Sequence, residues 1–215
     1  MFVRDQMSSP VVTVAPDLPF QEALRLMQER QFRRLPVVNE KGKLVGIVAE
    51  RDLLYASPSP ATSLSVWEMN YMLSKIKIER LMTREVITTT PDTTIEGAAY
   101  KMVQYRIGGL PVIEGDQVVG IITETDIFKT LVKMFGGGQH GLRLTLAVPS
   151  AKGVLASLSS AIFELGGNIL SVGSFPIERD PTLAGLVMKV QEVSKDQLID
   201  KLEALGDHVT DAREV

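Results

Sequence analysis

The sequence contains no cysteine and only two histidines. Without cysteine there can be no disulfide, no thiolate metal site and no cysteine nucleophile, and this composition fits a cytoplasmic protein. The two histidines, His140 and His208, lie outside any motif that combines a nucleophile, a base and an orienting acid. The scarcity of these residues therefore argues against several common catalytic mechanisms.

An excess of basic residues is also missing, because 23 lysines and arginines stand against 26 aspartates and glutamates, for a net charge of −3. A protein that neutralises several phosphates of a nucleic-acid duplex usually carries such an excess. We therefore expect no nucleic-acid binding, and a DNA-binding regulator is disfavoured because no basic recognition helix is evident. No uninterrupted apolar run approaches the ~18 residues of a membrane span, and residues 1–20 do not resemble an export signal. We expect no membrane association.

The sequence does contain a duplication, in which residues 7–54 align with residues 82–128. The offset changes by one residue in a turn between two apolar segments, where a hairpin tolerates an insertion. The spacing of apolar residues in each copy predicts the order β-α-β-β-α. In the first copy the predicted strands are 11–14, 35–38 and 44–48, and the first predicted helix ends at Arg30. The matched positions are Met7 with Met82, Pro16-Asp17 with Pro91-Asp92, Leu35-Pro36-Val37 with Leu110-Pro111-Val112, Gly46 with Gly120, and Asp52 with Asp126.

Two capping boxes predict helix starts. Thr93 and Glu96 predict the first helix of the second copy, with a buried stripe of Ala98, Ala99, Met102 and Val103. Ser65 and Glu68 predict a linker helix within residues 57–81. Its apolar stripe either packs on the repeats or, over Trp67 to Ile76, contacts a partner protein.

A glycine-rich segment, residues 135–141, follows the second copy. It formally satisfies G-x-G-x-x-G at Gly136, Gly138 and Gly141, but a dinucleotide site needs a strand before the motif and a helix after it. Here a predicted helix precedes the motif and a strand follows. We interpret the segment as a flexible linker at a domain boundary, where the relative orientation of the domains changes.

Residues 142–215 predict the order β-α-β-β-α-β of a ferredoxin-like split-βαβ sandwich. The predicted strands are 142–148, 169–175, 183–190 and 208–212, and the helices are 154–165 and one that begins at Ser194 and Gln197. The whole chain is therefore expected to be of mixed α/β (α+β) class.

We find no catalytic residue and no metal site in the sequence. The carboxylate pairs Glu50/Asp52 and Glu124/Asp126 lack a third ligand at a defined spacing, and loop carboxylates are commonly solvated. No nucleophile with a base and an orienting acid is present either. We therefore expect a protein that is not an enzyme and needs no catalytic cofactor.

Thr123 and Asp126 are candidates for ligand binding and not for catalysis, because they follow an apolar strand at the predicted start of a helix. A carboxylate can accept both hydroxyls of a ribose, and the hydroxyl lies beside N–H groups suited to an anion. The same spacing is also an ordinary helix cap. The duplication favours the nucleotide reading, since Arg33-Arg34 of the first copy correspond to Gly108-Gly109 and a pure cap does not explain this basic pair.

The Leu-Pro-Val segments, the Gly-x-x-Thr-x-x-Asp of the second copy and the Pro-Asp before each first helix resemble CBS motifs. Residues 1–134 are together similar to a CBS pair (Bateman module), which implies a regulatory module that binds an adenine nucleotide in its cleft. By this resemblance Asp126 holds the ribose, Thr123 meets ribose or phosphate, and Arg34 faces the phosphates. Asp52 gives only a weaker second site, because Ala49 stands where the hydroxyl is expected. The residues expected to flank the base are Ile87, Thr88, Pro111 and Val112.

Residues 142–215 resemble an ACT domain, on the segments 148–155 and 167–169. The resemblance implies a domain that dimerises and binds an effector such as an amino acid. The effector-binding residues would be Gly153, Val154, Asn168 and Ile169, where glycine lets a ligand approach the backbone. The order CBS pair then ACT is similar to CBS–ACT proteins of acetoin utilisation.

These inferences predict a regulatory sensor without catalytic activity, which passes its signal to an unidentified protein. The domains are expected to be a CBS motif (1–56), a linker helix (57–81), a second CBS motif (82–134), a glycine-rich linker (135–141) and an ACT domain (142–215). One alternative is an oligomerisation scaffold with empty clefts, which the missing hydroxyl at Ala49 favours. Another is an enzyme of acetoin or amino-acid metabolism.

Overall fold

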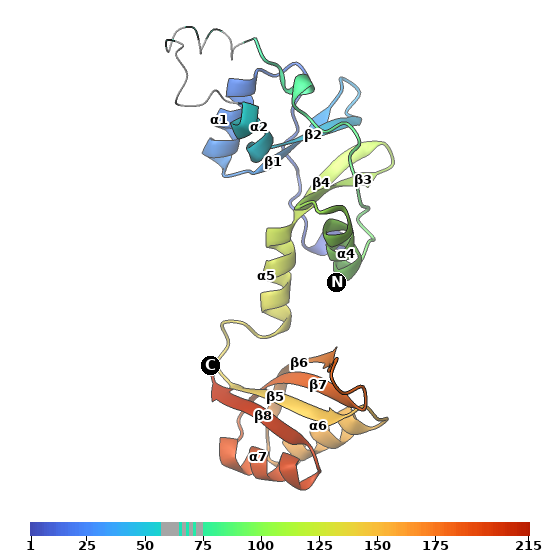
Figure 1. Cartoon of the computed structure of the whole chain (residues 1–215), viewed down its shortest axis with the longest axis vertical. Helices are drawn as coiled ribbons and strands as arrows, with labels where there is room; N and C mark the ends of the chain where they lie inside the picture. Colours follow the sequence, from blue (N-terminus) through green and yellow to red (C-terminus); the bar gives the residue numbers. More distant parts are fainter. Residues whose placement is uncertain (57–64, 66–67, 69–70, 72–74) are drawn as a thin grey trace. The chain divides into compact units, whose positions relative to one another are not determined.

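The computed structural model describes residues 1–56, 65, 68, 71 and 75–215. These residues divide into two units, Met1–Ile127 and Phe128–Val215 (Figure 1). The boundary falls inside helix α5, so the glycine-rich segment belongs to the second unit. The predicted linker helix (57–81), including Trp67, lies mostly outside the described residues, although Ser65 and Glu68 form the predicted reciprocal hydrogen bonds, N–H to Oε2 at 2.9 Å and N–H to Oγ at 3.3 Å.

The first unit contains the two copies of the repeat. Each copy has a two-stranded antiparallel hairpin with a helix on either side of it in sequence, because apolar residues recur with a period of two in the strands and near 3.6 in the helices. Proline-valine pairs occupy the middle of both first strands. The elements are η1 (Val3–Asp5), α1 (Phe20–Arg30), β1 (Arg34–Val38), β2 (Leu44–Ala49), α2 (Glu50–Ala56), η2 (Ile78–Arg80), α4 (Ile95–Tyr105), β3 (Gly109–Glu114), β4 (Gln117–Thr123) and α5 (Glu124–Met134).

The predicted strand at residues 11–14 was wrong in extent. Only Val14 pairs with the hairpin, through a parallel bridge to Val37 in which Val14 N–H donates to Pro36 O at 3.1 Å. Val12 is exposed, and Val11 and Val12 line a pocket instead of extending a sheet. This segment therefore runs between the two copies and lines the pocket there.

The start of α4 also differs from the predicted capping box. Thr94, not Thr93, is the N-cap, and its Oγ1 accepts a hydrogen bond from Gly97 N–H at 3.1 Å. Thr93 Oγ1 accepts from Thr90 N–H in the preceding turn. The shift of one residue leaves Ala98 and Met102 buried as expected, but Val103 faces outward with 77% of its surface exposed.

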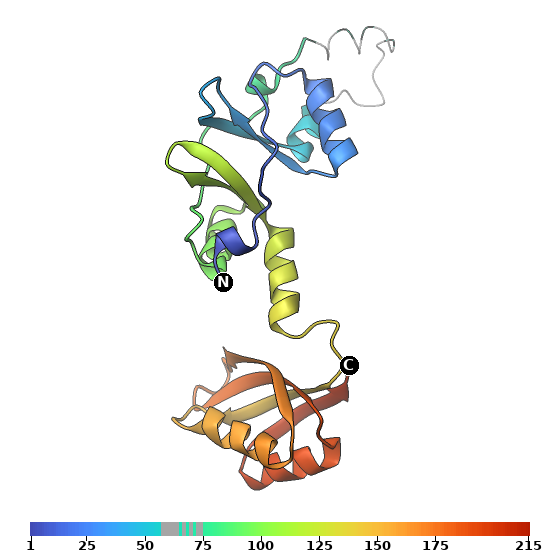
Figure 2. The ribbon, with the colours of Figure 1, turned by 180° about the vertical axis from the view of Figure 1, so that it is seen from behind.

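The two copies exchange their N-terminal segments. The N-terminal residues of the first copy pair with the second hairpin, where Ser8 and Ile121 form two backbone hydrogen bonds of 2.9 and 3.1 Å. The N-terminal residues of the second copy pair with the first hairpin, where Thr83 and Ile47 form two of 2.9 Å. Figure 2 shows the N-terminal segment (dark blue) beside α4 of the second copy.

This exchange extends into both hydrophobic cores. Val3, before the first copy, is fully buried in the core of the second copy with Ala98 and Ile122. Ile78, before the second copy, is fully buried in the core of the first copy with Phe20 and Leu53. Each core is completed by a residue that the sequence places beside the other copy.

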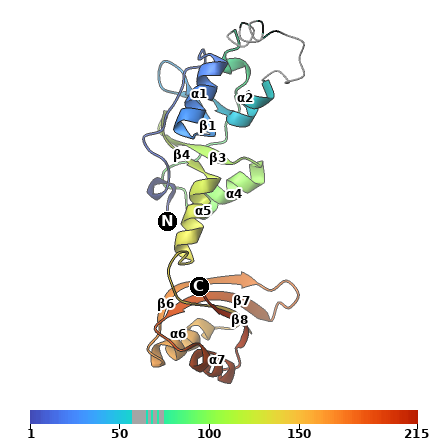
Figure 3. The ribbon, with the colours of Figure 1, turned by 90° about the vertical axis from the view of Figure 1, so that its left-hand side faces the viewer.

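The second unit has four antiparallel strands in the order β6-β7-β5-β8, with α6 and α7 on one face (Figure 3). This is the predicted split-βαβ order. Alternate residues of β5, from Leu142 to Val148, are buried with leucines of both helices, whereas Arg143 and Thr145 occupy the opposite face. The elements are β5 (Leu142–Pro149), α6 (Val154–Glu164), β6 (Asn168–Pro176), β7 (Leu183–Gln191), α7 (Lys195–Ala204) and β8 (His208–Glu214).

The glycine-rich segment is packed against the second unit. Gly136 is buried, and its carbonyl oxygen accepts a hydrogen bond of 3.0 Å from Lys189 Nζ. Gly137 N–H donates to Val132 O at 2.7 Å, and Phe135 lies so close to Gly173 that a Cβ there would be 2.5 Å from the ring. Within the described residues, no helix is long and apolar enough to cross a membrane.

Candidate functional site

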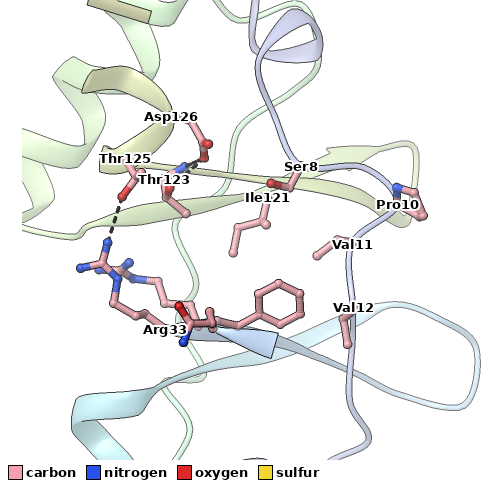
Figure 4. A pocket seen from close by; sticks show the side chains of 12 residues that line it. Ser8, Pro10, Val11, Val12, Arg33, Ile121, Thr123, Thr125 and Asp126 are labelled. Carbon is pink, nitrogen blue, oxygen red and sulfur yellow. Dashed lines mark hydrogen bonds between the residues drawn. The ribbon is translucent and has the colours of Figure 1, made fainter. Parts of the chain in front are cut away.

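A pocket of about 250 Å³ lies between the two copies in the first unit (Figure 4). One wall comes from the exchanged N-terminal segment of the first copy, a second from the start of β1, and a third from the junction of β4 and α5. The lining residues are Ser8, Pro10, Val11, Val12, Gln31, Phe32, Arg33, Arg34, Ile121, Thr123, Thr125 and Asp126.

Asp126 and Thr123 form the polar end of this pocket. Asp126 Oδ2 accepts hydrogen bonds from Thr123 N–H at 2.9 Å and from Thr123 Oγ1 at 2.7 Å (Figure 4). These bonds fix the carboxylate at the first turn of α5, so the group that the sequence singled out is both a cap and a pocket residue. A carboxylate held in this way presents a fixed acceptor to hydroxyl groups of a ligand.

The corresponding position in the first copy keeps only half of this arrangement. Ala49 N–H donates to Asp52 Oδ2 at 3.0 Å, which reproduces the backbone contact of the second copy. The hydroxyl contact is lost because Ala49 has no side-chain oxygen. The two copies therefore share a fold at this turn and differ in the polar groups that they offer.

Arginines of the first copy reach into the pocket from the side opposite Asp126. Arg33 Nη2 donates to Thr125 Oγ1 at 2.9 Å, so the first copy is tied to the start of α5 (Figure 4). Burial lowers the pKa of Arg34, the Glu124 carboxylate opposes this, and Arg33 and Arg51 lower the pKa further. Because a guanidinium stays charged in proteins, Arg33 and Arg34, which both line the pocket, favour an anionic group on this side of it.

Gly108 and Gly109 make room for Arg34. A Cβ at Gly108 would overlap the guanidinium of Arg34 and lie 2.6 Å from Glu124 Oε2, and a Cβ at Gly109 would lie 3.2 Å from Arg34 Cδ. The arginine pair of one copy and the glycine pair of the other are thus complementary. The difference between the repeats at this position has a steric cause.

The structure places Asp126, Thr123 and Arg34 in the lining of one pocket. It does not bring the four residues expected to flank a base to this pocket. Pro111 and Val112 are buried in the middle of β3, with Val112 fully inaccessible. Ile87 packs against the core of the second copy, and Thr88 contributes a carbonyl that accepts from Lys101 Nζ. The physical reason is the exchange of segments, which places Ser8, Pro10, Val11 and Val12 at this pocket, whereas Ile87 and Thr88 contact their own copy.

Sequence reasoning missed the apolar wall of Pro10, Val11 and Val12 and the polar residue Thr125. The signal was present in the repeat alignment, because residues 8–12 correspond to residues 83–87. Only the knowledge that each segment crosses to the other copy would have converted that alignment into the correct wall.

The predicted effector site in the second unit is divided. Gly153 and Val154 line a pocket of about 640 Å³ where β5 leads into α6. Asn168 and Ile169 lie at the start of β6 and do not line it, because Asn168 pairs with Gln191 at the far end of β7. The eight residues of β5 span seven steps of about 3.3 Å, which separates the two segments by roughly 23 Å within one chain. In the described part of the chain, no group of three or more His, Cys, Asp or Glu residues could hold a metal ion.

Comparison with known families places these features in context. The CBS domain family matches residues 3–59 and 78–133, which is more than half of the chain. The chain therefore belongs to the CBS domain family, and the two copies of the repeat form a CBS pair.

Solved structures give the same result for the first unit. The CBS domain pair of protein MJ0100 in complex with 5′-methylthioadenosine and S-adenosyl-L-methionine is 34% identical, with a TM-score of 0.52 over 65% of this chain and 98% of that one. A protein from Vibrio cholerae assigned to acetoin utilization (AcuB) is 29% identical, with a TM-score of 0.52 over 61% and 90% of the two chains. CBSX2 in complex with AMP is 26% identical, with a TM-score of 0.50 over 61% and 96%.

Several curated relatives are much longer than this chain. The L-aspartate semialdehyde sulfurtransferase of Methanocaldococcus jannaschii is 35% identical over 136 residues, which are 63% of this chain but 23% of that enzyme. The similarity thus spans about a quarter of that relative's length. CBS pairs generally act as regulatory modules, and some related proteins combine one with an enzyme.

Proposed function

We propose that this protein is a non-catalytic regulatory sensor whose CBS pair binds an adenine nucleotide in the pocket between the two copies. The observation that carries the proposal is the opposition of Asp126 and Thr123 to Arg33 and Arg34 across one pocket. A carboxylate suits ribose hydroxyls and a guanidinium cluster suits phosphates. The adenosine ligands in the MJ0100 and CBSX2 structures support the same ligand class.

The apolar wall supports a base rather than a sugar alone. Pro10, Val11 and Val12 lie opposite Arg33 and complete a pocket with both apolar and charged surfaces (Figure 4). Small-molecule sites typically combine an apolar lining with a few placed polar groups. The flat purine would lie against this wall while the ribose reaches Asp126.

Titration calorimetry of AMP, ADP, ATP and S-adenosylmethionine into the full chain tests the proposal. We expect one site with micromolar affinity, weakened about tenfold to a hundredfold in Asp126→Ala, because hydrogen bonds to a charged group contribute about 1.5–3 kcal/mol. Asp52→Ala is the matched control, since it removes the equivalent cap in the first copy. Equal weakening by both variants would point to a general effect on the fold and not to this site.

A second titration, with the variant Gly108→Ala, separates recognition of the phosphates from recognition of the nucleoside. Gly108→Ala displaces the Arg34 guanidinium, so it should weaken ATP more than S-adenosylmethionine, which carries no phosphate. If none of the four compounds produces heat, the CBS pair is a scaffold with an empty cleft, as the missing hydroxyl at Ala49 would favour.

We further propose that the second unit is an ACT domain that dimerises and binds an amino acid. Its support is the strand order β6-β7-β5-β8 with both helices on one face. Because Gly153 and Asn168 are far apart in one chain, an effector site that uses both needs two chains. Light scattering during size exclusion tests the homodimer, and titration with amino acids tests the ligand.

The regulatory output would pass to a partner protein in the cytoplasm, with the segment from Trp67 to Ile76 as the contact. The similarity to AcuB supports an association with acetoin utilization. Turnover by the purified chain of a substrate from acetoin or amino-acid metabolism would contradict the non-catalytic assignment.

A further inference from the structure

A second pocket, of about 630 Å³, lies between the glycine-rich segment and the sheet face opposite α6 and α7. It belongs entirely to the second unit and is distinct from the pocket near Gly153. Both its apolar and its polar residues come from two sources, the sheet and the segment that covers it. The lining residues are Phe135, Gly137, Gly138, Gln139, His140, Arg143, Ser171, Val187, Met188, Lys189 and Val215.

Strand register places three polar side chains in one row across the floor of this pocket. Arg143 of β5 pairs with Lys189 of β7, and Lys189 pairs with Ser171 of β6. Directly opposite residues in neighbouring strands have Cβ atoms about 4.5–5.5 Å apart. A guanidinium, an ammonium and a hydroxyl are therefore side by side in a pocket whose lining also includes Val187 and Phe135.

Two of these groups are buried without full hydrogen bonding. Lys189 is 5% exposed, and among the described residues its ammonium donates only to Gly136 O, at 3.0 Å, although it has three donors. Ser171 is 8% exposed and its hydroxyl has no hydrogen-bond partner within the described chain. A buried polar group without a partner is costly, so such groups commonly mark a place where a ligand supplies the missing contact.

The charge balance selects the class of ligand. Arg143 contacts Asp211 at 3.3 Å, a carboxylate that also pairs with Arg213, and among the described residues no ion pair involves the Lys189 ammonium. This ammonium suits an anionic group, and the ring of Phe135 and the side chain of Val187 suit an apolar body beside it. We infer that this pocket binds a small monocarboxylate with an apolar portion, whose carboxylate is held by Lys189 and Ser171.

This assignment also explains the packing of the glycine-rich segment. Gly136 lies over Lys189: a Cβ added at Gly136 would lie 3.3 Å from Lys189 Cδ and 3.9 Å from Ser171 Oγ. Any side chain at residue 136 would also be strained by its φ of +63°. The segment thus forms a lid of backbone atoms over the two polar groups, and a bound carboxylate would hold it there.

The full chain should be titrated with butyrate, 2-oxoisovalerate, valine and inorganic phosphate, one at a time, by calorimetry. We expect the two carboxylates without an amino group to bind, phosphate to bind more weakly because it lacks an apolar body, and valine to bind more weakly because its ammonium faces Lys189. Ser171→Ala should weaken the carboxylates about threefold to tenfold, and Lys189→Met about tenfold to a hundredfold, because a charged donor contributes more than a neutral one.

Lys195→Met, at an exposed lysine outside the pocket, is the matched control and should leave the affinities unchanged. Hydrogen exchange of residues 136–139 in the parent should slow when the carboxylate is present. Absence of binding by either carboxylate, or binding that neither Ser171→Ala nor Lys189→Met weakens, would overturn the assignment and leave Lys189 as an anchor of the segment. Tighter binding of phosphate than of both carboxylates would also overturn it.

Discussion

Substitution of Gly46 by alanine should destabilise the first unit more than the equivalent substitution at Gly120. A Cβ at Gly46 would overlap the sulfur of Met82, lie 2.9 Å from Met82 Cγ and lie 3.1 Å from the carbonyl oxygen of Thr83. That carbonyl accepts a hydrogen bond of 2.9 Å from Ile47 N–H, so the backbone cannot yield without loss of a contact between the copies.

The expected magnitude follows from two opposing terms. Overpacking a filled site costs about 1–3 kcal/mol, whereas replacing glycine by alanine recovers about 0.4–1 kcal/mol by restricting the unfolded chain. The net free energy of unfolding should fall by about 1–2 kcal/mol for Gly46→Ala, which corresponds to a decrease of about 4–8 °C in Tm for a unit of this size. Gly120→Ala meets Met7, which is only partly buried and can move, so its effect should be smaller.

Calorimetric unfolding of the full chain measures these changes, and hydrogen exchange assigns the transition to residues 1–127. Gly97→Ala in α4 is the control, because its Cβ would come no closer than 3.2 Å to Thr94 Oγ1 and alanine favours a helix. A Tm for Gly46→Ala equal to or above that of the parent would refute the close packing of the exchanged segment. A larger loss for Gly120→Ala than for Gly46→Ala would refute the role of the buried methionine.

Two further substitutions test local features of the structure. Thr94→Ala should destabilise α4 by about 1 kcal/mol through loss of its N-cap, and Thr93→Ala should destabilise it by less. Chemical denaturation measures both losses of stability, and a larger loss for Thr93→Ala would favour the capping box predicted from the sequence. Burial raises the pKa of Asp207, so the folded chain holds this proton more tightly than the unfolded chain, and stability is lost as pH rises from about 4 towards the folded pKa. Asp207→Asn should therefore raise Tm at pH 7 but not at pH 3, and an equal increase at both values would contradict the titration of this carboxyl.

The order of helices and strands could be predicted well from the sequence, because it depends on local periodicity. The hairpins of both copies, the first helix up to its end at Arg30 and the strand from Leu142 to Val148 were all read from the spacing of apolar residues. Apart from the N-cap of α4, which is Thr94 and not Thr93, the errors fell where tertiary contacts decide, such as residues 11–14. There the chain has the composition of a strand but runs between two copies, with only Val14 paired.

The candidate site was predicted less completely, for a topological reason. Thr123 and Asp126 lie three residues apart, so their hydrogen bond is local and readable. The wall at Pro10 to Val12 lies more than a hundred residues earlier in the chain, and no spacing rule connects the two. The row of Arg143, Lys189 and Ser171 was missed for the same reason, since strand order brings it together.

The exchange of N-terminal segments makes the pair of repeats indivisible. A fragment that holds one repeat with its own preceding residues would carry the segment that the other repeat needs and would lack the segment that it needs itself. In a fragment of the first repeat, Val3 would have no core to enter and the position of Ile78 would be empty; in a fragment of the second repeat, the reverse holds. Two fragments mixed together could still rebuild both cores by complementation, whereas either alone could not. The arrangement is that of an arm-swapped dimer joined into one polypeptide, so we expect the two repeats to unfold together as one cooperative unit.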